Sequence, residues 1–177
     1  MPREERTIHA VVGPISLREG SSSGGTRCEG VRCPDQPQED GSVAPDPEQL
    51  RAFAERYTTA WCSMDPAAVA AHYAPEGSLA INGDAPAVGR DAINAVAASF
   101  YEALPDMQVL FDDLVVDGER IEYHWTFTGT NTGPGGTGNA VRVDGFESWT
   151  IDEDGLIVAS LGSYDAEEYA RQLAKGV

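Results

Sequence analysis

The spacing of apolar residues changes once along this 177-residue chain, from a helical period to a strand period. Between Asp46 and Leu104 apolar side chains recur every three or four residues, which is typical of amphipathic helices. From Met107 to Tyr164 they alternate with polar residues, which is typical of strands with one buried face. Because the helices come first and consecutive strands follow, we predict an α+β domain. Its antiparallel sheet should wrap against the N-terminal helices on one face.

Local signals place the helices and strands. An aspartate followed by a proline, as at Asp46 and Asp65, is typical of the first turn of a helix. The helix that follows Asp65 is expected to carry Tyr73 on one side, and Asp117-Gly118 favours a tight hairpin. Helices are predicted from Asp46, from Asp65, over residues 90–104 and from Asp165, and strands over residues 77–82, 107–116, 119–130, 141–151 and 156–164.

Composition separates residues 1–45 from the rest. All 14 aromatic residues lie after residue 45, whereas residues 1–45 contain five Pro, six Gly and five Ser. Such a segment buries too little apolar surface to offset its ordering entropy. We therefore predict a disordered tail over residues 1–45 and a single folded domain over residues 46–177.

Two features of the predicted tail bear on location and metal binding. The apolar stretch Ile8–Leu17 is interrupted by Gly13 and Pro14, unlike the unbroken core of a secretory signal, so a cytoplasmic location is expected. Cys28 and Cys33 form a C-x4-C pair with no second Cys/His pair nearby. Four ligands would be needed for a structural zinc site, so no metal is predicted.

The charge of the chain excludes two classes of partner. The 12 Lys+Arg against 29 Asp+Glu give a formal net charge of −17. Nucleic-acid binding needs clustered cations to neutralise phosphates, and anionic membrane surfaces repel a chain of this sign. No apolar stretch approaches the roughly 18 residues of a membrane span. We therefore expect neither a nucleic-acid nor a membrane partner.

Glu147 is the carboxylate in an otherwise apolar row. In the strand over residues 141–151 it shares a face with Val143 and Trp149. A carboxylate there must be paired, hydrogen-bonded or shifted towards its neutral form, and a shifted one can shuttle a proton near neutral pH. Two other interpretations stay open: the assigned face is wrong by one residue, or Glu147 makes a structural hydrogen bond to a neighbouring Tyr or Trp.

Several segments together resemble the SnoaL-like polyketide cyclase family, which belongs to the nuclear transport factor 2-like superfamily with the ketosteroid isomerases and scytalone dehydratase. The resemblance covers about Asp46 to Leu173, and the order of its segments is more specific than any one of them. The segments are Tyr-Ala-Pro-Glu-Gly at 73–77, Gly-Arg-Asp-Ala-Ile at 89–93, the run from Trp125 to Gly133, Gly145-Phe146-Glu147 and Gly-Leu-Ile-Val at 155–158.

The resemblance implies a cone-shaped fold in which a curved sheet and helices enclose a deep apolar pocket, usually in a homodimer. It implies that Glu147, at the acidic position of a G-[IF]-[DE] strand motif, is the general acid/base. It further implies that Tyr57 donates a hydrogen bond to a substrate carbonyl. The residues expected to wall the substrate pocket are aromatic: Trp61, Phe100, Tyr123, Trp125, Phe127, Trp149 and Tyr164.

The sequence departs from the family at two positions. Asn131 stands where cyclases often have His, so a neutral hydrogen-bonding group replaces one acid/base partner. Ile81 stands near the position of the isomerase base, which argues against steroid isomerase activity.

Two hypotheses follow. The first is a cofactor-free cyclase or isomerase of a small apolar, polyketide-like carbonyl compound, with Glu147 moving a proton and Tyr57 or Asn131 polarising the carbonyl. The second is a pocket of the same fold that holds a ligand, or merely dimerises, without turnover.

Overall fold

The alternating half of the chain forms most of a six-stranded sheet in a computed structural model that describes residues 46–118 and 120–177. The sheet order is β2-β1-β6-β5-β4-β3, and neighbouring strands are antiparallel except for β1 and β6, which are parallel. The predicted tail and its two cysteines lie outside the described residues. The strands are β1 (Tyr73–Ile81), β2 (Ala87–Val88), β3 (Gln108–Asp117), β4 (Arg120–Thr130), β5 (Ala140–Ile151) and β6 (Ile157–Tyr164).

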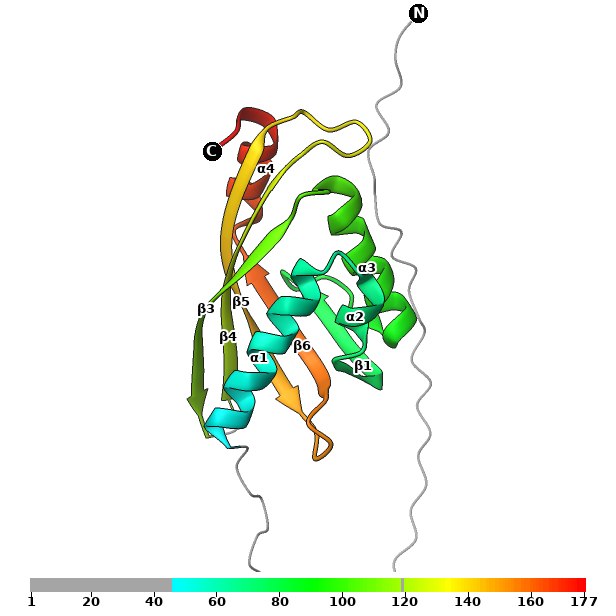
Figure 1. The fold of residues 1–177 in the computed structure, drawn as a ribbon, viewed down its shortest axis with the longest axis vertical. Helices are drawn as coiled ribbons and strands as arrows, with labels where there is room; N and C mark the ends of the chain where they lie inside the picture. Colours follow the sequence, from blue (N-terminus) through cyan, green and yellow to red (C-terminus); the bar gives the residue numbers. More distant parts are fainter. Residues whose placement is uncertain (1–45, 119) are drawn as a thin grey trace, which may run out of the picture. The chain divides into compact units, whose positions relative to one another are not determined.

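Four helices accompany the sheet: α1 (Pro47–Cys62), α2 (Pro66–Ala70), α3 (Arg90–Ala103) and α4 (Ala166–Lys175). The side chains of Asp46, Asp65 and Asp165 each accept a backbone N–H in the first turn of a helix, which satisfies a donor that the helix itself leaves free. Helix α1 packs against β3, α3 against β1, and α4 against β5 (Figure 1). The predicted α+β architecture is therefore confirmed. Of the described helices, none is long and apolar enough to cross a membrane.

The start of β1 differs from the prediction. Tyr73 was expected on the short helix, but α2 ends at Ala70, and β1 begins at Tyr73 instead of Gly77. Pro75 supplies no N–H, and the pairing of β1 with β6 shifts register between Tyr73 and Ser78, so this part of the strand is irregular. The strand β2 has only two residues, too few to show a period in the sequence.

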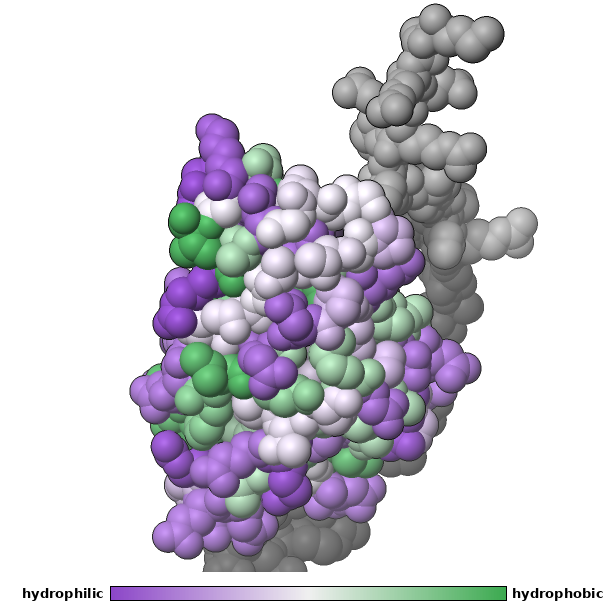
Figure 2. Space-filling view, turned by 45° about the horizontal axis from the view of Figure 1, so that its top comes forward, coloured by the Kyte–Doolittle hydropathy of each residue, from purple (hydrophilic) through white to green (hydrophobic). Residues whose placement is uncertain are grey.

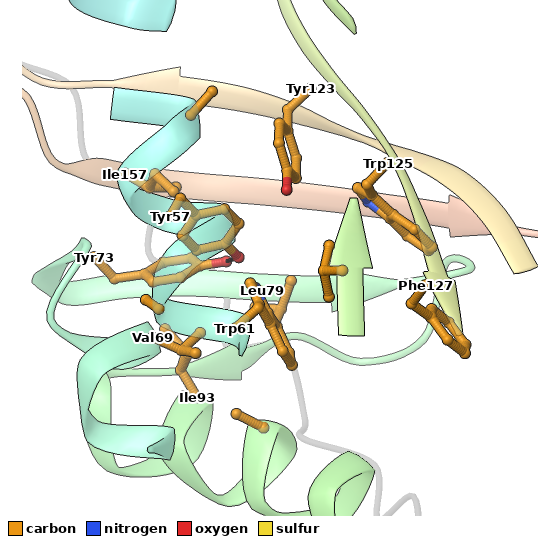
Figure 3. Close-up of a cluster of buried hydrophobic side chains, with 14 of the residues drawn as sticks. Tyr57, Trp61, Val69, Tyr73, Leu79, Ile93, Tyr123, Trp125, Phe127 and Ile157 are labelled. Carbon is orange, nitrogen blue, oxygen red and sulfur yellow. Dashed lines mark hydrogen bonds between the residues drawn. The ribbon is translucent and has the colours of Figure 1, made fainter. Parts of the chain in front are cut away.

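The core lies between the helices and one face of the sheet, here called the inner face. Figure 3 shows aromatic side chains from α1 and β4 gathered there, among them Tyr57, Trp61, Tyr123 and Trp125. The rings pack edge-to-face and stacked; for example, Tyr57 and Trp149 have centroids 5.3 Å apart at 90°. The alternation in β4 and β5 thus sends large apolar side chains inward, as predicted.

Candidate functional site

Strand β5 carries Glu147 into the core. Its side chain lies on the inner face between Gly145 and Trp149, and the residue is only 6% exposed. The one-residue error that the sequence left open is therefore excluded. Glu147 is also one of the residues that line a cavity, so an apolar space lies beside this side chain.

Three side chains donate hydrogen bonds to Glu147 Oε2. Ser160 Oγ lies 2.6 Å away, Trp149 Nε1 3.0 Å and the Tyr57 hydroxyl 3.1 Å. The Tyr57 hydroxyl also lies 3.4 Å from the other oxygen, Oε1, and the Tyr73 hydroxyl is close enough to the carboxylate to lower its pKa by hydrogen bonding. The two oxygens differ, because Oε2 accepts the three shorter hydrogen bonds and the contact of Oε1 with Tyr57 is longer.

A second tyrosine extends this network. The hydroxyls of Tyr57 and Tyr73 are 2.9 Å apart, and both side chains are fully buried. An ionised carboxylate can only accept, so Tyr57 donates to Glu147, whereas in the contact between the two hydroxyls either oxygen can be the donor. Burial raises the pKa of both phenols well above 10, and the nearby Glu147 charge raises it further. Both tyrosines are therefore neutral donors at any physiological pH.

Burial also controls the charge of Glu147. Desolvation raises the pKa of its carboxyl above 4.5, whereas the hydrogen bonds from Ser160, Trp149, Tyr57 and Tyr73 lower it. The net direction is upward. A carboxyl with a raised pKa beside a cavity is suited to exchanging a proton with a bound molecule.

The cavity beside Glu147 is almost entirely apolar. Its empty space, including the open mouth, is about 510 Å³. Helices α1 and α3 and every strand except β2 contribute to its wall. The lining residues are Trp61, Leu79, Ile81, Phe100, Met107, Val109, Tyr123, Trp125, Phe127, Glu147, Gly162 and Tyr164.

The structure brings most of the residues predicted for the pocket to this cavity. Six of the seven aromatic side chains line it; Trp149 instead packs behind Glu147, with its ring stacked on Tyr123 at 4.8 Å. The Tyr57 hydroxyl contacts Glu147 and Tyr73 rather than the cavity. Asn131 follows β4 in a loop, where its amide donates to Thr137 at 3.2 Å. It is not among the described residues that line the cavity.

Sequence reasoning missed two members of the network, Ser160 and Tyr73. Alternation counted back from Tyr164, which was expected in the pocket, places Ser160 inward, whereas alternation counted forward from the buried Ile157 does not. Tyr73 was assigned to a helix, which concealed its direction. Among the described residues, no group of three or more His, Cys, Asp or Glu side chains is placed to hold a metal ion.

A family model for the SnoaL-like domain matches residues 54–160, and the chain belongs to that family. The match includes ten of the twelve residues that line the cavity; Gly162 and Tyr164 follow it in the sequence. No curated protein matches the chain.

Solved structures share the fold at low sequence identity. A protein from Jannaschia sp. CCS1 assigned to the SnoaL-like polyketide cyclases is 17% identical, with a TM-score of 0.64 over 73% of this chain and 94% of that one. TsrD from Streptomyces laurentii is 24% identical, with a TM-score of 0.63 over 72% and 96%. SalBIII, an epoxide hydrolase/cyclase-like enzyme of pyran ring formation in salinomycin, is 16% identical, with a TM-score of 0.60 over 70% and 95%. The chain therefore shares the fold of these proteins, and other solved structures that match it are nuclear transport factor 2-like proteins.

Proposed function

We propose that the protein is a cofactor-free cyclase or isomerase of a small, apolar, polyketide-like carbonyl compound, with Glu147 as the general acid/base. The observation that carries the proposal is the asymmetry of its carboxylate. Oε2 accepts three hydrogen bonds of 3.1 Å or less, Oε1 receives a longer contact of 3.4 Å, and Glu147 is one of the residues that line an apolar cavity. Family membership and the cyclase and cyclase-like structures support this class of reaction.

In this mechanism Glu147 Oε1 removes a proton from the carbon next to the substrate carbonyl. The electron pair of the C–H bond moves towards the carbonyl oxygen, and the resulting enolate attacks within the same molecule or is reprotonated at another carbon. Ser160, Trp149 and Tyr57 hold the carboxylate in position. Tyr57 therefore acts as a positioning residue, because its hydroxyl contacts Glu147.

Solvent deuterium exchange tests the proton transfer directly. The wild type is incubated with 1-indanone in D2O, and loss of the C2 protons is followed by NMR. We expect exchange above background, reduced about 10²- to 10⁴-fold by Glu147→Gln. The matched control is Glu122→Gln, which removes a carboxylate that is also buried but pairs with Arg120 on the opposite, outer face of the sheet. Equal exchange by the wild type and Glu147→Gln would exclude the role of Glu147.

A binding function without turnover is the second candidate. It is favoured because neither Tyr57 nor Asn131, the two groups expected to polarise a carbonyl, is among the described residues that line the cavity. This candidate predicts that 1-indanone binds the wild type while its C2 protons exchange only at the background rate.

We also propose that the protein is a homodimer formed through the outer face of the sheet. The exposed side chains of Leu110, Val115 and Leu161 lie on that face. Their cross-strand partners on the same face are Thr126, Glu122 and Ser148, respectively. His124 and Phe146 stack on the same face at 5.6 Å. This mixture of apolar and polar side chains on the outer face suits a self-complementary pair. Figure 2 gives another view of the surface, in which small hydrophobic and hydrophilic patches alternate.

A further inference from the structure

Trp125 is held rigidly on the inner face of β4. It is 9% exposed, and its ring stacks on Phe127 with centroids 5.6 Å apart. Directly across the strand pair lies Gly145, where an added Cβ would be 2.7 Å from Cη2 of the indole and 2.6 Å from the Ser163 carbonyl. Only glycine at 145 leaves room for the indole to lie against β5. The ring therefore has a defined position.

The indole N–H of Trp125 is buried and has no acceptor among the residues that the structure describes. An indole nitrogen can only donate, and folded proteins pair nearly all buried donors. Trp149 follows that rule, because its Nε1 donates to Glu147. The free donor of Trp125 is a polar group that the protein itself leaves unused.

This donor belongs to the same cavity as Glu147. Trp125 and Glu147 both line it, and strand register makes them diagonal neighbours, because Tyr123 is opposite Glu147 and Trp125 opposite Gly145. Such diagonal positions are about 7 to 8 Å apart. In Figure 3 the nitrogen of Trp125 lies on the side of the ring that faces Tyr123. The indole nitrogen itself is closed to solvent, so the oxygen of a small molecule in the cavity would reach it by displacing side chains that pack on it.

We propose that Trp125 Nε1 donates the hydrogen bond that binds the oxygen of the ligand. The ligand is a neutral, largely apolar cyclic molecule with an acceptor oxygen at one edge. An anion is disfavoured beside the Glu147 carboxylate, and the apolar wall offers a charged group little compensation. With the proposed function, on which this part rests, the acceptor is the carbonyl whose neighbouring carbon faces Glu147. Trp125 then takes the polarising role that the sequence assigned to Tyr57 or Asn131.

Binding of a matched pair of probes tests the hydrogen bond without relying on catalysis. Two probes are titrated into each protein: 1-indanone, and indane, which has the same skeleton without the carbonyl. The proteins are the wild type, Trp125→Phe and Phe127→Leu. Indole N–H signals are followed by NMR on 15N-labelled protein. Two quantities are measured: the affinity ratio of indanone to indane and the shift of the Trp125 N–H signal.

We expect the indanone-to-indane affinity ratio of the wild type to exceed that of Trp125→Phe by about 5- to 100-fold, since a buried acceptor loses its partner in the variant. Indanone should shift the Trp125 N–H signal downfield, and indane should not. The control Phe127→Leu also reshapes the wall beside Trp125, but it should weaken both probes alike and keep the ratio.

An unchanged ratio in Trp125→Phe, or no binding of either probe to the wild type, would overturn the assignment. Glu147→Gln separates this proposal from the proposed function. If that variant keeps the affinity ratio and the wild type shows no deuterium exchange, the donor role of Trp125 stands and the catalytic role of Glu147 fails.

Discussion

Replacing Glu147 with Gln should change how the stability of the protein depends on pH. Burial raises the pKa of Glu147 in the folded state, whereas in the unfolded chain it stays near 4.5. Between these two values the folded state binds more protons than the unfolded state. The free energy of unfolding contributed by this group is therefore highest below about pH 4.5 and decreases as pH rises through the folded pKa.

The size of the effect follows from one titrating group. A single proton changes the free energy of unfolding by at most about 1.4 kcal/mol per pH unit within that window. Gln has a similar shape and does not titrate, so the Glu147→Gln protein lacks this dependence. The difference in free energy of unfolding, wild type minus variant, should become more positive as pH falls towards 4.5 and should be constant above the folded pKa.

Urea denaturation at half-unit steps from pH 4.5 to 8 measures this difference. Subtracting the two proteins removes the contributions of the other acidic residues, which dominate a chain with a formal net charge of −17. Glu122→Gln controls for the loss of one buried negative charge. If the difference in free energy of unfolding between wild type and Glu147→Gln is constant from pH 4.5 to 8, the hydrogen-bond donors of Glu147 cancel the effect of desolvation on its pKa. That result would refute the reasoning. A difference that grows with rising pH would refute it as well.

Three further expectations concern the cavity wall, the strand packing and the assembly. At Gly162 an added Cβ would lie 3.7 Å from Cγ of Glu147, an ordinary contact, so Gly162→Ala should keep its melting temperature while 1-indanone binds more weakly in a titration. Gly145→Ala should lower the free energy of unfolding in urea by about 1 to 3 kcal/mol, because its Cβ meets the Trp125 ring. Light scattering at micromolar concentration should give twice the 18.9 kDa chain mass, and a monomeric mass would contradict the dimer.

Much of the fold could be predicted because period and helix caps are local properties. Asp46, Asp65 and Asp165 cap their helices as the sequence indicates, and the alternation in β5 sends Glu147 inward. The parallel pairing of β1 with β6 could not be predicted in this way. It joins segments about 80 residues apart, and nothing in the spacing of either strand records its partner.

The aromatic wall of the cavity was also predictable, whereas its polar contacts were not. A strand's period gives the face of each side chain, so Tyr123, Trp125 and Phe127 could be assigned to the interior together. Which atoms meet depends on distances between elements. The Tyr57 hydroxyl was therefore expected at the substrate, and it contacts the carboxylate of Glu147.

The register of β6 shows why this last level escapes the sequence. The pairing of β5 with β6 shifts between Thr150 and Ile151, and this shift sets Ser160 opposite Trp149 and Gly162 opposite Glu147. Hydropathy alone would favour Leu161 as an inward residue, yet Leu161 is 60% exposed and Ser160 only 1%. Because strand alternation has a period of two, a slip of one residue would turn Leu161 inward and remove the Ser160 donor from Glu147. The environment that tunes the carboxylate therefore depends on one irregularity in strand pairing, which leaves no mark in the apolar pattern.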